Sequence, residues 1–271
     1  MPDFPLTAFL LGLGLSVVAV GLLMVVTFAV ATAQKRHSVI DVAWGLGFVL
    51  IAAVTFLASG STDTGDDGRR LLVLVLVTVW GVRLAAFIGW RGLDGKEDPR
   101  YEEMLADPSG SAAALAVRKV YLPQAGVMLF VSLPLQVAMV STGTLGVVAW
   151  VGALMWAVGV FFEAVGDQQL ASFKNDPARR GTVLDTGLWR YTRHPNYFGD
   201  ALVWTGLFLV AAESWPGVLT VLSPALMIWA LAGKTGKPLT EERMSRRPGY
   251  KEYVERTSGF FPLPPKAGRG S

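Results

Sequence analysis

The run LTAFLLGLGLSVVAVGLLMVVTFAVATA, residues 6–33, carries no charged side chain over 28 positions. A helix needs about 20 apolar residues to cross the roughly 30 Å hydrocarbon core of a bilayer, so this run is long enough to span one with some tilt. It is not typical of a cleavable signal peptide, because the residues before it lack positive charge and the run exceeds a signal peptide's apolar region. This stretch predicts a membrane protein.

Six further apolar segments follow it along the chain. The seven candidate spans are Leu6–Ala33, Val39–Ser59, Leu71–Gly89, Val120–Val140, Thr144–Val165, Phe198–Ala212 and Pro216–Gly233. The composition agrees with this assignment, since only 17% of the residues are charged, against about 25% in a soluble protein. We therefore expect an all-α, polytopic integral membrane helix bundle of about seven transmembrane helices, with residues 1–271 forming a single membrane domain.

The charge distribution predicts an orientation for this bundle. Threading seven spans alternately places 21 of the 24 Lys and Arg residues on one side. Because cytoplasmic loops carry an excess of Lys and Arg, we expect the N-terminus outside and the C-terminus in the cytoplasm, in a bacterial inner (cell) membrane. Anionic membrane lipids explain the basic loops, so no nucleic-acid partner is expected. The sequence does not set an oligomeric state.

The residue types that are missing narrow the chemistry. The chain has no cysteine and only two histidines, His37 and His194. Disulfides, iron–sulfur clusters and thiolate catalysis are therefore excluded, and little remains from which to build a histidine metal site. No metal is expected.

Polar side chains within the spans are candidates for function, because burying each in lipid costs about 2.5–3.5 kcal/mol. Four stand out in the apolar segments: Asp41, Arg83, Gln136 and Glu163. Asp41 and Glu163 lie near span ends, where solvation of the helix end is an adequate alternative. Gln136 follows Pro134, so it is expected to satisfy a kink. Arg83 is expected to face a polar cavity.

The densest polar segment is EAVGDQQLASFKNDPARRGTVLDTGLWRYTRHPNYFGD, residues 163–200. It interleaves five cations and His194 with aromatic and amide side chains. Guanidinium groups suit phosphates and aromatic faces suit a base, so this composition is compatible with a nucleotide held at the membrane surface. A basic loop that contacts lipid headgroups is the alternative.

The sequence GLWRYTRHPNYFGD at 187–200 resembles the C-terminal signature of the steroid 5-alpha-reductase family, and more closely its bacterial DUF1295 branch. DVAWG at 41–45, EDPRY at 97–101, DQQL at 167–170 and PGYKEY at 248–253 extend the resemblance over nearly the whole chain. The resemblance implies an integral membrane oxidoreductase that holds NADPH and reduces a carbon–carbon double bond of a lipophilic substrate from the bilayer. Such a substrate is a steroid-like enone, an isoprenoid or another unsaturated lipid.

The resemblance also implies positions for the cofactor contacts, within loops and helix ends between residues 163 and 262. The positions are Asp167, Lys174, Arg190, Tyr191, Arg193, His194, Asn196, Tyr197, Asp200, Trp204, Glu242, Tyr250 and Tyr253. Asp200 and Trp204 are four residues apart at the start of a predicted helix, so they are expected to share one face.

Three residues are candidates for catalysis in the N-terminal half. Arg83 is expected to supply positive charge at a substrate carbonyl oxygen, and Trp80 a hydrogen-bond donor or a packing wall. Trp80 stands where the steroid reductases carry a tyrosine, so the substrate need not be a steroid. Asp41 is a candidate proton source if burial keeps it protonated.

Two other functions compete with the reductase. Isoprenylcysteine and phospholipid methyltransferases share the Arg-His-Pro-x-Tyr-x-Gly pattern of residues 193–199 and bind S-adenosylmethionine. The surplus of cations favours a phosphorylated cofactor over S-adenosylmethionine, which carries no phosphate. A non-enzymatic transporter or scaffold is the third alternative, and it is disfavoured because the polar residues do not follow a path through the spans.

Overall fold

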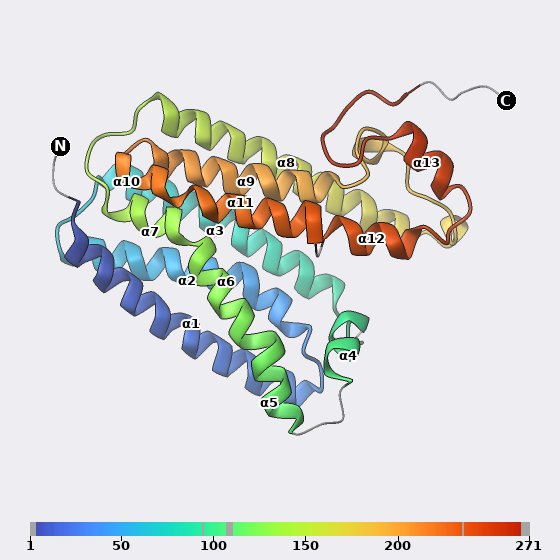
Figure 1. Ribbon diagram of the computed structural model, residues 1–271, viewed down its shortest axis with the longest axis horizontal. Helices are drawn as coiled ribbons and strands as arrows, with labels where there is room; N and C mark the ends of the chain where they lie inside the picture. Colours follow the sequence, from blue (N-terminus) through green and yellow to red (C-terminus); the bar gives the residue numbers. More distant parts are fainter. Residues whose placement is uncertain (1–3, 94, 107–110, 235, 267–271) are drawn as a thin grey trace. The chain divides into compact units, whose positions relative to one another are not determined.

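The computed structural model describes residues 4–93, 95–106, 111–234 and 236–266, and these residues form helices without any strand (Figure 1). An isolated bridge pairs Thr192 with Ser258. The helices are α1 (Leu6–Gln34), α2 (Val39–Ser61), α3 (Asp67–Arg91), α4 (Pro99–Leu105), α5 (Ala112–Ala116), α6 (Leu122–Val131), α7 (Leu133–Val140), α8 (Val147–Asn175), α9 (Pro195–Ala212), α10 (Trp215–Val218), α11 (Leu222–Trp229), α12 (Lys237–Met244) and α13 (Tyr250–Arg256). The all-α prediction is confirmed.

Among the residues that the structure describes, six stretches of helix are long and apolar enough to cross a membrane. They are Leu6–Gln34, Val39–Ser61, Asp67–Arg91, Ala112–Val140, Val147–Asn175 and Trp215–Met244. Each matches one of the seven predicted spans. Because of these six helices, the chain is an integral membrane protein. The remaining predicted span lies in α9, which is 18 residues long and carries Asn196 and Asp200 in its first turns. Its length corresponds to about 27 Å, so the number of spans stays a prediction.

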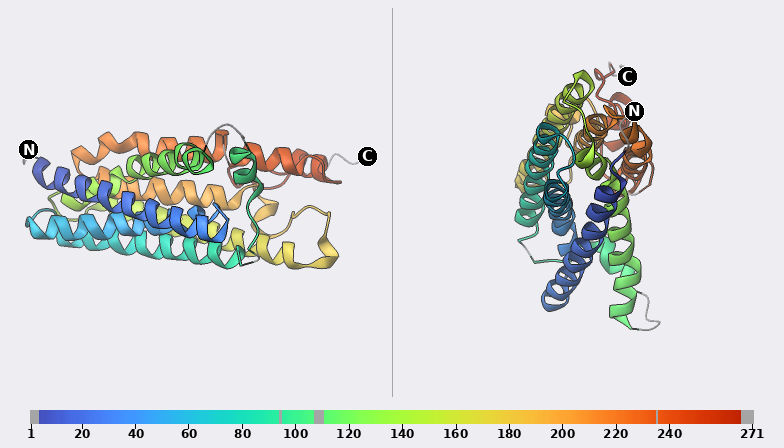
Figure 2. Two further views of the ribbon diagram at one scale, coloured as in Figure 1. Left: turned by 90° about the horizontal axis from the view of Figure 1, so that it is seen from below. Right: turned by 90° about the vertical axis from the view of Figure 1, so that its left-hand side faces the viewer.

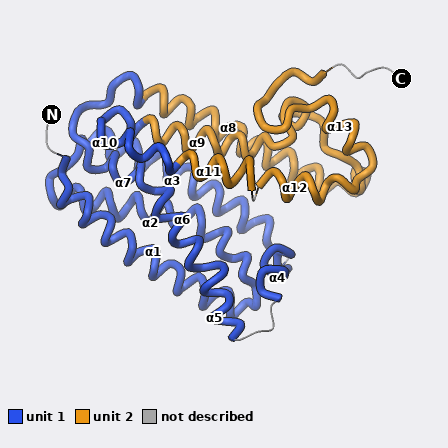
Figure 3. Tube along the Cα trace, in the orientation of Figure 1, with its two compact units in different colours: residues 1–149, 210–223 blue, residues 150–209, 224–271 orange. Residues whose placement is uncertain are grey.

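The chain divides into two compact units (Figure 3). The first contains residues 1–149 and 210–223, and the second contains residues 150–209 and 224–271.

In the first unit, α1, α2 and α3 run side by side (Figure 2). Glycine allows α2 and α3 to approach closely, because a Cβ atom added at Gly45 would lie 2.5 Å from the Gly81 carbonyl oxygen. Association of membrane helices depends on close packing, so small residues at the contact are expected. Asp66 begins α3 as its N-cap and accepts a hydrogen bond from the Arg69 backbone N–H.

In the second unit, glycines also hold α8 and α9 together. A Cβ atom added at Gly199 would lie 2.5 Å from the Gly159 carbonyl oxygen, and one added at Gly206 would lie 2.5 Å from that of Gly152. From one pair to the next, each helix advances by seven residues, which is about two turns. The two helices are therefore antiparallel and in backbone contact along a shared seam, and this seam leads to the polar residues.

Candidate cofactor site

The polar end of the seam brings together side chains from α8 and α9. A Cβ atom added at Gly166 would lie 3.2 Å from the Asn196 backbone nitrogen, so the two helices still touch there. One residue further, the Asn196 side-chain amide donates a hydrogen bond to the Asp167 carboxylate at 3.2 Å. Asp167 and Glu163, one turn apart on α8, are both buried. The predicted residues Asp167 and Asn196 are thus adjacent.

Two more predicted residues continue from Asn196 along α9. Asp200 and Trp204 follow at intervals of four residues within this helix, so they share one face, as the sequence predicts, and Asn196 lies on it as well. Trp204 is fully buried and Asp200 partly so. This face offers an amide, a carboxylate and a large aromatic ring in a row.

A short 3₁₀ turn, Gly187–Arg190, closes against the end of α8. The Trp189 indole N–H donates a hydrogen bond to the Gly166 carbonyl oxygen at 3.1 Å. The Gln169 side chain accepts a hydrogen bond from the Leu188 backbone N–H at 2.9 Å. Gly187 adopts a φ of 61°, and a Cβ there would collide with Gln169. These contacts fix the start of the motif that leads into α9.

An ionic cluster ties the next part of the motif to α12. The Arg193 guanidinium pairs with the Glu241 carboxylate, with Nε and Nη2 each 2.9 Å from Oε1. The His194 ring nitrogen Nε2 lies 3.1 Å from the same oxygen. Burial lowers the pKa of His194 below its usual value, although Glu241 opposes the shift. Arg193 also donates to the Thr257 carbonyl oxygen at 2.6 Å, so this predicted cofactor residue holds the C-terminal segment.

Glu241 is a residue that the sequence prediction missed. The prediction selected Glu242, which is exposed on α12. The pair Glu241-Glu242 gives no means of choosing between the two until the rotation of α12 is known. The only available signal was that the buried cations beside the Arg-His-Pro motif require an acidic partner.

The predicted tyrosines have structural contacts. Tyr197 stacks on His194 with ring centroids 5.4 Å apart and an angle of 7°. The Tyr253 hydroxyl donates a hydrogen bond to the Trp189 carbonyl oxygen at 2.7 Å, and burial raises the pKa of Tyr253. Tyr250 is also buried, with its ring 6.1 Å from that of Tyr253. The tyrosines of α13 thus fasten this helix to the motif.

The other predicted cations lie at the surface of the second unit. Lys174 occupies the last turn of α8 and is exposed. Arg190 and Tyr191 are exposed at the end of the 3₁₀ turn.

In the first unit, Asp41 lies at the centre of a polar network. Its carboxylate accepts hydrogen bonds from Arg100 at 2.9 Å and from the Tyr101 hydroxyl at 2.5 Å. Gln124 donates to the Tyr101 oxygen at 3.3 Å. Burial, together with the neighbouring Asp41 carboxylate, raises the pKa of Tyr101, so its hydroxyl keeps its proton. Asp41 therefore accepts hydrogen bonds from two side chains of the segment 97–101.

The adjoining loop caps α2. Glu97 accepts hydrogen bonds from the backbone N–H groups of His37 and Ser38 at the start of α2. Partial burial opposes ionisation, but these hydrogen bonds hold the pKa of Glu97 below its usual value. Asp98 begins α4 as its N-cap and pairs with Arg100 at 3.0 Å. The motif EDPRY therefore joins two helices, a role that its spacing alone does not reveal.

Trp80 and Arg83 lie one turn apart on α3. Trp80 is fully buried, and its ring lies 5.8 Å from that of Phe48 on α2. Arg83 is partly buried. The close glycine contact at Gly81 fixes this part of α3 against α2. Both residues therefore lie on a rigid helix pair, as a precise binding site requires.

Fold and site together define the class of protein: a polytopic α-helical membrane protein with a polar cluster where two glycine-packed helices end. The family model described as "Protein of unknown function (DUF1295)" matches residues 27–257, so the chain belongs to the DUF1295 family. A protein of Schizosaccharomyces pombe that is described as uncharacterized is 23% identical over 263 residues, covering 88% of this chain and 76% of that protein. No solved structure matches the chain. The family predicted from the motifs is confirmed.

Proposed function

We propose that this protein is an NADPH-dependent reductase that saturates a carbon–carbon double bond of a lipophilic substrate. The observation that carries the proposal is the Asp167–Asn196 pair, continued by Asp200 and Trp204 on one face of α9. These side chains occupy the positions that the steroid 5-alpha-reductase resemblance assigns to the cofactor. They belong to the buried end of a helix pair whose backbones are in contact.

The chemistry of these residues fits the nicotinamide ribose part of the cofactor. Asn196 can exchange hydrogen bonds with a carboxamide, because its amide both donates and accepts. The carboxylates of Asp167 and Asp200 accept hydrogen bonds from ribose hydroxyls, and the Trp204 indole provides an apolar wall. Lys174, at the exposed end of α8, supplies positive charge for a phosphate. When bound, the cofactor would supply a hydride to the substrate.

The residues of α3 have a separate role in this proposal. Arg83 provides a fixed positive charge for a substrate carbonyl oxygen, on which negative charge develops as a conjugated double bond is reduced. Trp80 forms an apolar wall beside it. We assign Asp41 to the positioning of the segment 97–101, because it accepts hydrogen bonds from Arg100 and Tyr101.

Ligand binding by the detergent-purified protein tests the proposal. A ligand that binds only the folded state raises the melting temperature as its concentration passes the Kd. We expect stabilisation by NADPH and none by S-adenosylmethionine, with NADH as the comparison for the 2′-phosphate. Stabilisation by S-adenosylmethionine alone would identify a methyltransferase, and stabilisation by none of the three would favour a transporter or scaffold.

A pair of amide variants locates the site. Asn196→Ala removes the amide that contacts Asp167, whereas Gln168→Ala removes an exposed amide on α8. We expect Asn196→Ala to weaken NADPH binding by about tenfold or more, which corresponds to about 1.4 kcal/mol, and Gln168→Ala to leave it unchanged. Equal binding by both variants would place the cofactor elsewhere.

A further inference from the structure

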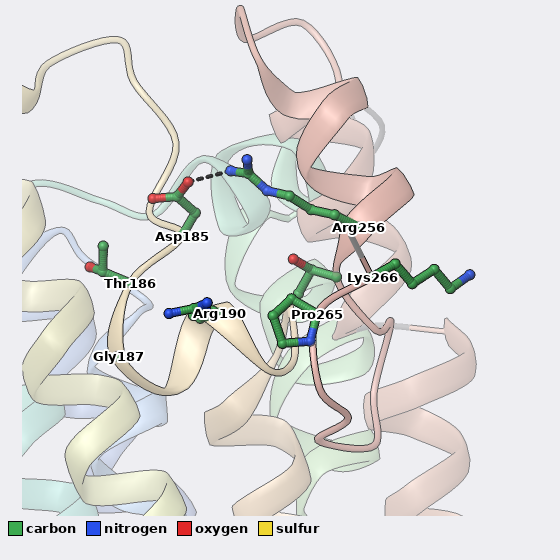
Figure 4. Close-up of a pocket in the computed structure, with 8 residues that line it drawn as sticks. Asp185, Thr186, Gly187, Arg190, Arg256, Pro265 and Lys266 are labelled. Atoms are coloured by element: carbon green, nitrogen blue, oxygen red, sulfur yellow. Dashed lines mark hydrogen bonds and ion pairs between the residues drawn. The ribbon is translucent and has the colours of Figure 1, made fainter. Parts of the chain in front are cut away.

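A second feature of the second unit is a surface pocket that includes none of Asp167, Asn196, Asp200 and Trp204, and only Arg190 of the positions that the resemblance implies for the cofactor. It has a volume of about 480 Å³ and lies between the loop before α9 and the C-terminal segment (Figure 4). Its lining residues are Asp185, Thr186, Gly187, Arg190, Arg256, Thr257, Pro265 and Lys266. The pocket is thus formed by two segments about 70 residues apart in sequence, held together by the ion pair between Asp185 and Arg256.

The charge of this pocket is positive. Three of the lining side chains are cations. The one anion, Asp185, forms an ion pair with Arg256. The Arg190 side chain is exposed on the 3₁₀ turn and makes no hydrogen bond or ion pair with any residue that the structure describes. Lys266 extends outward from the same rim (Figure 4). The Arg190 guanidinium is therefore available to a phosphate group, which it can bind through two parallel hydrogen bonds, and Lys266 is a second cation on the same pocket.

The segment that precedes Pro265 carries exposed apolar side chains. Phe261 is 66% exposed and Leu263 is 55% exposed. The Phe261 ring contacts Phe198 at 6.1 Å, and Phe198 contacts Phe162 of α8 at 5.1 Å. The neighbouring Phe161, 54% exposed, belongs to the apolar surface of a spanning helix. This row of phenyl rings connects Phe261 with the apolar surface of the spanning helix α8.

The C-terminal segment holds this position through the backbone. The Leu263 N–H donates a hydrogen bond to the Tyr191 carbonyl oxygen at 3.0 Å, and the Lys266 N–H donates to that of Arg256 at 2.9 Å. Tyr191 is itself 43% exposed, so it adds an amphipathic ring beside Arg190. The cationic pocket and the apolar residues are therefore fixed next to one another.

We propose that this pocket binds the phosphate of an anionic phospholipid headgroup. The Arg190 guanidinium contacts the phosphate, the acyl chains lie against Phe261 and Leu263, and Lys266 adds attraction from the rim. The apolar border selects a lipid over a free phosphate ion, since only the lipid gains from covering those side chains. A zwitterionic lipid is disfavoured because its ammonium group meets a positive pocket. This inference does not rest on the proposed reductase activity.

Lipid titration followed by native mass spectrometry tests the proposal. The full-length protein in a neutral detergent is titrated with phosphatidylglycerol and, separately, with phosphatidylcholine. We expect phosphatidylglycerol to bind more tightly, and Arg190→Gln to weaken its binding by about tenfold. Arg246→Gln, which removes an exposed cation outside the pocket, is the matched control and should bind like the unaltered chain. Because Arg190 has no described partner, both variants should keep the melting temperature of the unaltered protein.

Competition identifies the source of the phosphate. Inorganic phosphate should displace phosphatidylglycerol only weakly, and adenosine 2′,5′-bisphosphate should not displace it better than inorganic phosphate does. Strong displacement by the bisphosphate, with weaker NADPH binding by Arg190→Gln, would assign the pocket to the dinucleotide and overturn the proposal. Equal binding of both lipids, or no effect of Arg190→Gln, would overturn it as well.

Discussion

The Asn196 amide donates a hydrogen bond to the Asp167 carboxylate at 3.2 Å, across a helix contact in which Gly166 approaches the Asn196 backbone. The two residues are 29 positions apart in the sequence, and a basic loop separates them. Their side chains meet because glycines along α8 and α9 let the two backbones touch. The polar cluster therefore depends on the apolar seam below it.

Substitution of a glycine tests the contact between α8 and α9. Gly199→Ala would place a Cβ atom 2.5 Å from the Gly159 carbonyl oxygen, so the helices must separate. We expect a loss of about 1–3 kcal/mol of stability from this overpacking, together with weaker NADPH binding. The melting temperature in detergent measures the first effect. Gly14→Ala is the control, because nothing lies within 4 Å of its added Cβ, and it should be neutral or slightly stabilising.

The Arg193–Glu241 pair makes a second prediction. Glu241→Gln removes the charge that balances Arg193, whose side chain is only 10% exposed. We expect a loss of about 2–3 kcal/mol, since the guanidinium is left largely buried without its anion. Glu242→Gln changes the exposed neighbour and should alter stability by less than about 0.5 kcal/mol. Equal melting temperatures for the two variants would show that the cluster does not support the fold.

His194 predicts how stability depends on pH. Burial lowers its pKa in the folded state below the usual value of 6.5, so the unfolded chain binds a proton more readily. This contribution to stability is present above about pH 6.5 and is lost as the pH falls from there towards the lowered pKa. His194→Gln removes the titrating group, so the variant should lose less stability over that interval. Parallel curves for the two proteins would exclude His194 as the cause.

Asp41 predicts a local effect in the first unit. Asp41→Asn removes the charge that pairs with Arg100 and the best acceptor for the Tyr101 hydroxyl. The segment 97–101 should then unfold locally more often, so a protease should cut the chain between α3 and α5 faster. Glu102→Gln, which alters an exposed carboxylate on α4, should leave the cleavage rate unchanged. A proteolysis pattern that is identical for Asp41→Asn and the unaltered protein would contradict the role we assign.

The long helices could be predicted from the sequence, because an uncharged apolar run of about 20 residues is typical of a helix that spans a membrane. The predicted first span, Leu6–Ala33, differs from α1 by one residue. The fourth spanning stretch begins earlier than predicted, at Ala112, because its first turns tolerate Arg118 and Lys119, which lie in a π-helical turn, Val117–Tyr121. The length and the charge of a segment can be read without knowing its neighbours, so they are sufficient to predict the spanning helices.

The partners of the polar residues were harder to predict. Asp167 and Asn196 were identified by resemblance, but the role of Arg100 and the choice of Glu241 over Glu242 were not. These depend on how each helix is rotated and which helix it packs against, and such information is absent from a local pattern. Arg193 illustrates the point, since its contacts with Glu241 and the Thr257 carbonyl oxygen were not predicted.

The most direct test of the reductase proposal follows a labelled hydride. The protein, reconstituted with an extract of unsaturated membrane lipids, is incubated with NADPH that carries deuterium at the transferable position of the nicotinamide, and the lipids are analysed by mass spectrometry. We predict a saturated product that gains one deuterium and one hydrogen, and that forms more slowly with Asn196→Ala at an NADPH concentration near the Kd of the unaltered protein. Lipids that contain no deuterium, under conditions in which NADPH is shown to be bound, would contradict the proposal.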